Sequence, residues 1–298
     1  MDRVPSVFRE RVAALWKCCD RLYCNGNCRK MPDCEWTRIS RKRRIQFHIG
    51  MKKGNWVYGF TALDETAGAD RFLTMAELEN SPNLKNVVIA GIDVVFDGSI
   101  YRLKANLRPL DVDMEVLMKF VTFLSNEPSL QMHSGSAELF DSPEASTLIQ
   151  WLQKMHYSLI EIESYGTTLN RLLERQFSRS KTPIIKLGWL GNGREFLEAE
   201  LAALRIKRCS FFADFSTNVV DAIVGRFMED PSQFGEDYSV QCRFKDDEMK
   251  KLLKGYERKN QCNKKKGDTF TFQGPNERIL ILQIGATNWW HLSANTSM

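Results

Sequence analysis

Residues 157–212 read YSLIEIESYGTTLNRLLERQFSRSKTPIIKLGWLGNGREFLEAELAALRIKRCSFF and alternate short apolar runs with amphipathic segments. The short runs are typical of strands and lie at 157–164, 182–189 and 205–212. The segments between them carry apolar residues at helical spacing and lie at 167–178 and 194–204. The strands recur at roughly 21 to 25 residues, the length of one strand plus one helix. This alternation predicts a short parallel sheet with helices along one face.

The same rhythm continues on both sides of this stretch. A helix is expected at 142–155, with Ser142 as its N-cap and Pro143 at its first position. Further helices are expected at 216–229 and 245–260, with a strand at 237–244 between them. An antiparallel pair at 268–274 and 278–285 is expected to close the chain.

The part of the chain before residue 140 has strand alternation of another kind. Residues 44–61 alternate apolar and polar side chains around KKGN, which predicts an antiparallel hairpin with Trp56 and Tyr58 on opposite faces. A second hairpin is predicted at 86–105, with Asp97-Gly98 as its turn. The predicted fold class is therefore α+β, with a short N-terminal helical segment, antiparallel hairpins and an α/β repeat-like half of strand–helix units. The expected division is a helical segment 1–43 and an α/β domain 44–298, with a split near 140 as the alternative.

Composition excludes several classes of protein. The chain has 298 residues and a net charge of +5, which is mild and argues against nucleic acid as a partner. No run approaches the roughly 18 apolar residues of a membrane span, and the charged N-terminus does not read as a signal peptide. We therefore expect no membrane association, a cytoplasmic or nuclear location, and no disulfides.

Five of the eight cysteines lie in KCCDRLYCNGNCRKMPDCEW, residues 17–36. A zinc site is one interpretation, and its four ligands would be Cys19, Cys24, Cys28 and Cys34. The segment has no C-x-x-C pair and no histidine, and cysteines also pack as small buried hydrophobes. The spacing favours packing cysteines and no metal or other cofactor, with zinc as the alternative.

Enzyme signatures are scarce. The histidines are far apart in sequence, and neither H-E-x-x-H nor G-x-S-x-G occurs. His48 lies in an alternating strand, where a structural role is expected. We predict that the chain is not an enzyme. Trp289 and Trp290 stand side by side, so in a strand one of them faces outward as a candidate interaction anchor, and packing is the alternative.

The opening segment resembles an F-box. Val4-Pro5 stands for the Leu-Pro pair that begins that module, and Cys34-Glu35-Trp36 stands for its later Cys/Trp signature. The apolar helix positions between them are filled by Val7, Phe8, Val12 and Leu15. The whole chain is similar to nematode-type F-box-like proteins, in which a "W…R…F.I" pattern and a "G.W.Y.F" hairpin follow the box. The matching residues here are Trp36, Phe47, Ile49, Gly54, Trp56, Tyr58 and Phe60.

The resemblance implies an adaptor, a substrate-recognition subunit of a Skp–cullin–F-box ubiquitin ligase. Its Skp-type partner would bind at Pro5, Phe8, Val12, Leu15 and Trp36, and its α/β domain would bind an unknown target protein. The alternative is a zinc-dependent or nucleic-acid-binding module that uses the N-terminal cysteines and the basic run Arg41 to Arg44.

Overall fold

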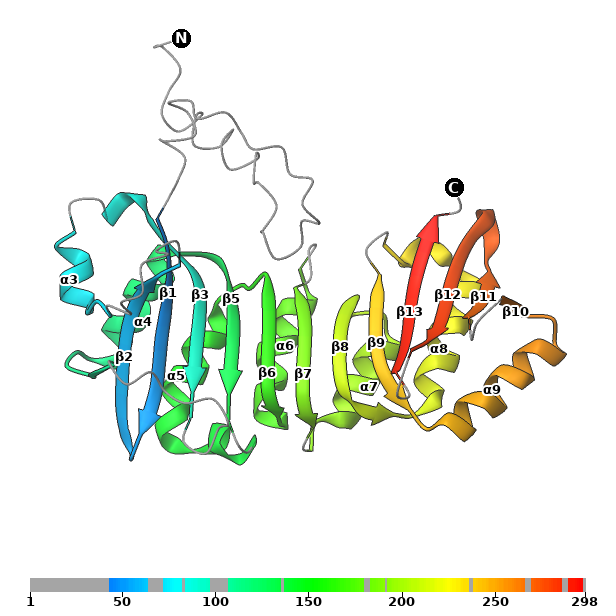
Figure 1. Ribbon diagram of the computed structural model, residues 1–298, viewed down its shortest axis with the longest axis horizontal. Helices are drawn as coiled ribbons and strands as arrows, with labels where there is room; N and C mark the ends of the chain where they lie inside the picture. Colours follow the sequence, from blue (N-terminus) through cyan, green and yellow to red (C-terminus); the bar gives the residue numbers. More distant parts are fainter. Residues whose placement is uncertain are drawn as a thin grey trace, which may run out of the picture.

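The computed structural model shows one long mixed sheet with helices α4 to α8 along one of its faces (Figure 1). The described residues are 43–63, 72–81, 84–96, 107–134, 137–179, 183–190, 192–235, 238–265, 269–285 and 289–296. Within them, the sheet has 13 strands in the order β10-β11-β12-β13-β9-β8-β7-β6-β5-β3-β1-β2-β4.

The bounds of the elements follow the chain. The strands are β1 Arg43–Lys52, β2 Asn55–Ala62, β3 Val87–Val95, β4 Arg108–Pro109, β5 Ser125–His133, β6 Leu159–Tyr165, β7 Ile184–Leu190, β8 Arg208–Phe215, β9 Ser239–Phe244, β10 Asn263–Lys265, β11 Thr269–Gln273, β12 Arg278–Ile284 and β13 Trp289–Thr296. The helices are α3 Met75–Glu79, α4 Met114–Leu124, α5 Pro143–Lys154, α6 Asn170–Phe177, α7 Arg194–Ala202, α8 Thr217–Glu229 and α9 Asp246–Arg258. Short 3-10 helices lie at Leu84–Asn86, Ala137–Asp141, Thr167–Leu169, Pro231–Gln233 and Pro275–Glu277.

The centre of the sheet is parallel and its two ends are antiparallel. Strands β1, β3, β5, β6, β7, β8 and β9 lie side by side and run in one direction. From β5 to β9, one α-helix precedes each strand along the chain. The antiparallel ends are β2 with β4, and β13 to β10. The expected α+β fold with strand–helix units is confirmed.

Helix starts follow their capping residues. Ser142 Oγ accepts a hydrogen bond from the Ala145 N–H at 3.2 Å, and Pro143 opens α5 as the sequence predicted. Asp113 caps α4 by accepting from the N–H groups of its first turn. These caps fix where each helix begins relative to the strand before it.

One line of buried side chains crosses the sheet beneath the helices. Register partners on neighbouring strands place in it Phe60, Phe47, Ile92, Leu130, Ile160, Ile185, Cys209, Val240, Leu292, Leu282 and Phe270. We call this set the inner row. Each member is apolar and buried, so the row joins the parallel centre and both antiparallel ends into one core.

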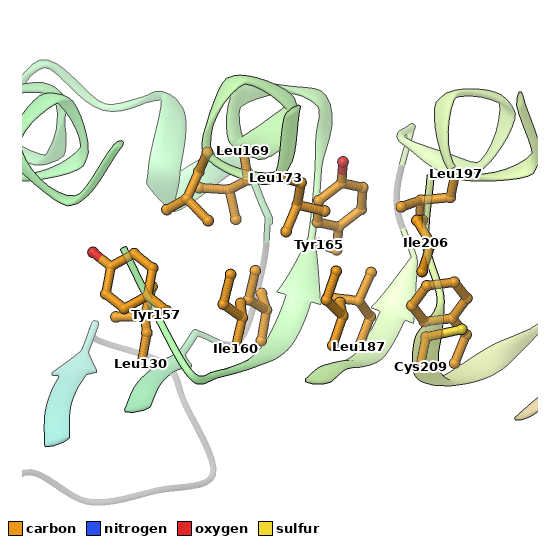
Figure 2. Packing of buried hydrophobic residues seen from close by; sticks show 14 of the residues in the cluster. Leu130, Tyr157, Ile160, Tyr165, Leu169, Leu173, Leu187, Leu197, Ile206 and Cys209 are labelled. Atoms are coloured by element: carbon orange, nitrogen blue, oxygen red, sulfur yellow. The ribbon is translucent and has the colours of Figure 1, made fainter. Parts of the chain in front are cut away.

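The inner row meets the helices through interdigitated side chains. Figure 2 shows Leu130 and Ile160 of the inner row, and Leu187 of β7, on the strand side of this contact, with Leu169 and Leu173 on the helix side. All five are fully buried. A Leu-to-Ala change at such positions typically costs roughly 2–5 kcal/mol of unfolding free energy, because a cavity is left behind.

The first predicted hairpin is confirmed, but one detail of it is wrong. β1 and β2 pair from Ile45↔Ala62 to Lys52↔Asn55, around a turn in which Lys53 and Gly54 have φ of 53° and 77°. Trp56 and Tyr58 lie on the same face, not on opposite faces, because side chains two residues apart in a strand point the same way. Both pack in the core, Trp56 partly and Tyr58 fully buried.

The second predicted hairpin is wrong. Val87–Val95 forms β3, but this strand pairs in parallel with β1 on one side and β5 on the other. Both of its edges are therefore occupied, and no antiparallel partner can pair along it. Residues 97–106, which contain the Asp97-Gly98 turn, lie outside the described residues. The sheet itself continues across residue 140, since β5 pairs directly with β6.

Candidate functional site: the outer face of the sheet

A second line of side chains crosses the sheet on the face opposite α4 to α8. Its members each neighbour one residue of the inner row, and they are Gly59, His48, Asp93, Gln131, Glu161, Lys186, Ser210, Gln241, His291, Gln283 and Thr269. We call this set the outer row. Because strand side chains alternate in direction, the two rows point to opposite faces. Apart from Gly59, the outer row is entirely polar.

One end of the outer row is covered. A Cβ placed on Gly59 would lie 2.8 Å from Phe72 Cδ1 and 3.1 Å from Leu107 Cδ2, so these two side chains lie against β2 on this face. The Phe72 ring also meets the His48 ring edge-on at 5.4 Å. His48 is therefore only 3% exposed, although the opposite face of the same strand carries the core.

Beneath this cover, polar groups form a chain across four strands. His48 Nδ1 donates to Asp93 Oδ2 at 3.0 Å, and His48 Nε2 lies 2.8 Å from Thr61 Oγ1. On the other side of the carboxylate, Asp93 Oδ1 lies 3.5 Å from His133 Nε2. The cluster links β2, β1, β3 and β5. Its hydrogen bonds compensate for the burial of the His48 ring nitrogens and the Thr61 hydroxyl, whereas Asp93 Oδ1 is buried without a hydrogen-bond partner among the described residues.

The order hydroxyl, imidazole, carboxylate is also that of a hydrolase triad. Here Thr61 and His48 are 9% and 3% exposed and lie next to the Phe72 side chain. A nucleophile must be presented to its substrate, and this hydroxyl is buried, so the cluster is a structural cross-link. It agrees with the structural role expected for His48. The partners Asp93 and His133 were not foreseen, because parallel pairing of distant strands brings them together.

The middle of the outer row is open. Gln131, Glu161, Lys186 and Ser210 are partly exposed, and Gln241 is exposed. Glu161 and Lys186 are direct register neighbours on β6 and β7, so opposite charges stand side by side. This stretch offers donors, acceptors and both charge signs to a bound molecule rather than an apolar surface.

Aromatic side chains follow at the carboxyl end of the parallel strands. Phe212 of β8 is 58% exposed, and its ring meets Trp289 of β13 edge-on at a centroid distance of 4.8 Å. Between them, Arg243 Nε of β9 lies 3.6 Å from Asp214 Oδ1. We call Phe212, Asp214, Arg243 and Trp289 the aromatic patch. Large exposed aromatic rings next to arginine are typical of protein-binding hot spots.

The side chains of the two adjacent tryptophans point to opposite faces of β13, as those of neighbouring strand residues do. Trp290 is 1% exposed and packs in the core, while Trp289 faces the outer side. The prediction that one of the two tryptophans faces outward is therefore confirmed, and its role as an interaction anchor remains a prediction. The sequence had no signal for Phe212, whose run CSFF reads equally well as buried strand. Trp189, 78% exposed at the end of β7, was likewise not foreseen.

His291 is the titratable member of the outer row nearest the patch along β13. Burial lowers the pKa of His291 below its usual value. Ser239 Oγ lies 2.9 Å from its Nε2. The ring is therefore neutral at neutral pH and acts there as a hydrogen-bonding group, not as a cation.

The cysteines of the described residues are free and buried. Cys209, Cys242 and Cys262 form no disulfide. Burial, with Cys209 as a hydrogen-bonding neighbour, raises the pKa of the Cys242 thiol well above its usual value, which makes it unreactive. Within the described residues, no group of three or more His, Cys, Asp or Glu side chains is arranged so that it could hold a metal ion.

The partner-binding residues predicted from sequence lie elsewhere. Residues 1–42 are outside the described residues, and with them the predicted partner-binding and alternative zinc-binding side chains. These are Pro5, Phe8, Val12, Leu15, Trp36, Cys19, Cys24, Cys28 and Cys34. They remain predictions.

No helix among the described residues is long and apolar enough to cross a membrane. Comparisons of the chain with models of protein families, with curated proteins and with solved structures find no match. Function is therefore inferred from the residues, their geometry and the sequence resemblance given above.

Proposed function

We propose that this chain is a non-enzymatic adaptor that binds a target protein on the outer face of its sheet. The observation that carries the proposal is the aromatic patch, in which Phe212 remains 58% exposed against Trp289. Such rings bury large areas on binding at little cost in conformational entropy, and they dominate interface energies. The open polar residues Gln131 to Gln241 beside the patch supply the hydrogen-bonding rim of such an interface.

The helical layer favours this arrangement. Helices α4 to α8 cover only the inner face, as Figure 1 shows from the outer side. Repeating strand–helix units that leave one face of the sheet open form extended binding surfaces in other repeat proteins. Residues on regular strands also hold their side chains in fixed positions, which suits recognition of one partner surface.

At the N-terminus, the proposal follows the F-box resemblance. Pro5, Phe8, Val12 and Leu15 would insert into a groove of a Skp-type subunit and so connect the target to a ubiquitin ligase. Such an adaptor works in the cytoplasm or nucleus. The free thiols Cys209, Cys242 and Cys262 suit a reducing compartment of this kind.

Calorimetric titration of the full chain with a purified Skp-type subunit tests this half of the proposal. Phe8→Ala should weaken binding by roughly 2 kcal/mol, or about 30-fold, and Val12→Asp should abolish it, because both remove apolar anchors. Phe212→Asp is the matched control and should bind as the wild type does. A wild-type chain that never binds the subunit, or a Val12→Asp chain that binds normally, would refute the ligase connection.

A further inference from the structure

Helix α4 carries apolar side chains on two sides. Its buried side packs in the core through Leu117, Met118, Val121 and Leu124. Val116, Phe120 and Phe123 follow the spacing i, i+4, i+7, so they form a second stripe along the helix. Val116 is 48% and Phe123 81% exposed, and Phe120 is half-buried. We call these three residues the α4 stripe.

The α4 stripe lies on the side of α4 that faces away from α5. The Phe120 ring meets the Phe60 ring of β2 at 6.1 Å and 80°, which places the stripe toward the β2 end of the sheet. The later helices contact helical neighbours, as Phe177 of α6 and Phe196 of α7 do by stacking. On the β2 side of α4, the five-residue α3 bonds to Tyr58 through the Met75 N–H but leaves Val116 and Phe123 exposed. The last unit of a repeat array requires a cap at such a flank.

The preceding part of the chain enters the sheet close to this flank. Ile45 of β1 pairs with Ile89 of β3, which pairs with Ser125 at the start of β5. Since α4 ends at Leu124, Phe123 lies at the edge where the parallel strands begin, roughly 10 Å across the sheet from β1. The chain reaches β1 at Arg43 on this same edge, as Figure 1 shows.

The sequence before Arg43 has the chemistry to cover the stripe. Ile39 is four residues before Arg43, so the Cα atoms of the two residues are at most roughly 14 Å apart. Trp36 and Ile39 are large apolar residues, and both lie within seven positions of Arg43 in the sequence. In β1, Arg43 shares the face of Ile45 and of the helices, and the last turn of α4, at its carboxyl end, has no basic residue. Cations are favourable at that end of a helix.

We propose that residues 36–42 of this chain dock on the α4 stripe, with Trp36 and Ile39 covering Val116 and Phe123. The contact caps the helical layer and fixes the N-terminal segment relative to the sheet. It assigns Trp36 to this internal contact rather than to the Skp-type partner. The proposal goes beyond the adaptor function and does not rest on it.

Hydrogen exchange of the full-length chain, followed by mass spectrometry, tests the docking. Phe123→Asp should raise the exchange rate of the amides in 36–42 roughly tenfold or more, because a docked segment exchanges only after it opens. Ile39→Asp should raise exchange in the last turn of α4. Trp189→Asp changes an aromatic side chain of β7 that is 78% exposed, close to the 81% of Phe123, and as the matched control it should change neither.

Three results would overturn the proposal. The first is that the amides of residues 36–42 exchange at unprotected rates in the wild type, or that Phe123→Asp and Val116→Asp leave their wild-type exchange rates unchanged. The second is a wild-type dimer in sedimentation that Phe123→Asp dissociates, since a second copy would then cover the stripe. The third is protection of Phe123 and its neighbours that arises only after a Skp-type subunit is added, which would assign the stripe to that partner.

Discussion

Two neighbouring lines of side chains cross the same strands, one residue apart, and they have opposite chemistry. The inner row, from Phe60 to Phe270, is apolar and buried under the helices. The outer row, from Gly59 to Thr269, is polar apart from Gly59 and, from Gln131 onward, partly exposed or exposed. The period of a strand makes this separation possible, because adjacent residues point to opposite faces. The comparison indicates that one row holds the fold together and that the other is available for binding.

The largest expected effect is a difference in unfolding free energy between a variant in the inner row and a variant at the next residue, in the outer row. Ile160→Ala should lower the unfolding free energy by roughly 2–4 kcal/mol, because its side chain is fully buried in the core. Glu161→Ala, at the next residue and on the outer face, should change it by no more than about 0.5 kcal/mol. Urea unfolding followed by circular dichroism measures both. Equal losses would show that the outer row also carries the fold.

The next largest expected loss of stability comes from a substitution where the backbones of β6 and β7 pack closely. A Cβ on Gly188 would lie 2.4 Å from the Glu163 carbonyl oxygen, so Gly188→Ala should cost roughly 1–3 kcal/mol by forcing the strands apart. Gly225 lies in α8 with no atom within 4 Å of such a Cβ. Gly225→Ala should therefore be neutral or stabilising by up to about 1 kcal/mol. Thermal unfolding of the two variants distinguishes them, and a stable Gly188→Ala protein would contradict the packing.

Removing a carboxylate should cost more stability at the covered end of the outer row than in the exposed aromatic patch. Asp93→Ala leaves the buried His48 Nδ1 without its acceptor, and we expect a loss of roughly 1–3 kcal/mol. Asp214→Ala breaks an ion pair whose side chains are 50% and 44% exposed, and should cost roughly 0–1 kcal/mol. Chemical denaturation of the pair of variants is the measurement. A smaller loss for Asp93→Ala than for Asp214→Ala would remove the distinction between covered cluster and open patch.

The smallest expected effect is a dependence of stability on pH. Burial lowers the pKa of His291 in the folded chain, so below about pH 6.5 the unfolded chain binds more protons than the folded one. Stability should be constant above that pH and should fall as the pH drops from there through the folded pKa. His291→Gln should flatten this part of the curve. An unchanged slope between pH 6.5 and pH 5 in the variant would assign the effect to other groups.

The strand–helix units were predictable because their signals are local. The run at 182–189 alternates Ile185 and Leu187 with exposed positions, and Ser142-Pro143 marks a helix start. Strand β5 was missed, because Ser125–His133 contains Pro128 and only two apolar residues, Leu130 and Met132, that indicate its buried face. The hairpin at 86–105 was predicted from a turn signal, whereas β3 is held by parallel neighbours whose pairing leaves no local trace.

The candidate site was less predictable than the fold. The sequence predicted that one of Trp289 and Trp290 faces outward, because adjacent residues of a strand point to opposite faces, but it did not say which one. Phe212 joins Trp289 only through β9, which lies between β8 and β13 in the sheet, and the order of strands cannot be deduced from spacing. The His48–Asp93 contact depends in the same way on the register of β1 with β3.

Site-specific photo-crosslinking in cells tests most directly whether the outer face binds a target. A photoreactive residue replaces Phe212 in one full-length variant and Lys119, an exposed residue of α4, in another. The adaptor account predicts a protein crosslinked from position 212 that is absent from position 119 and is lost when Trp289→Ala is added. The same crosslinked proteins at both positions, or a crosslink at 212 that survives Trp289→Ala, would contradict it.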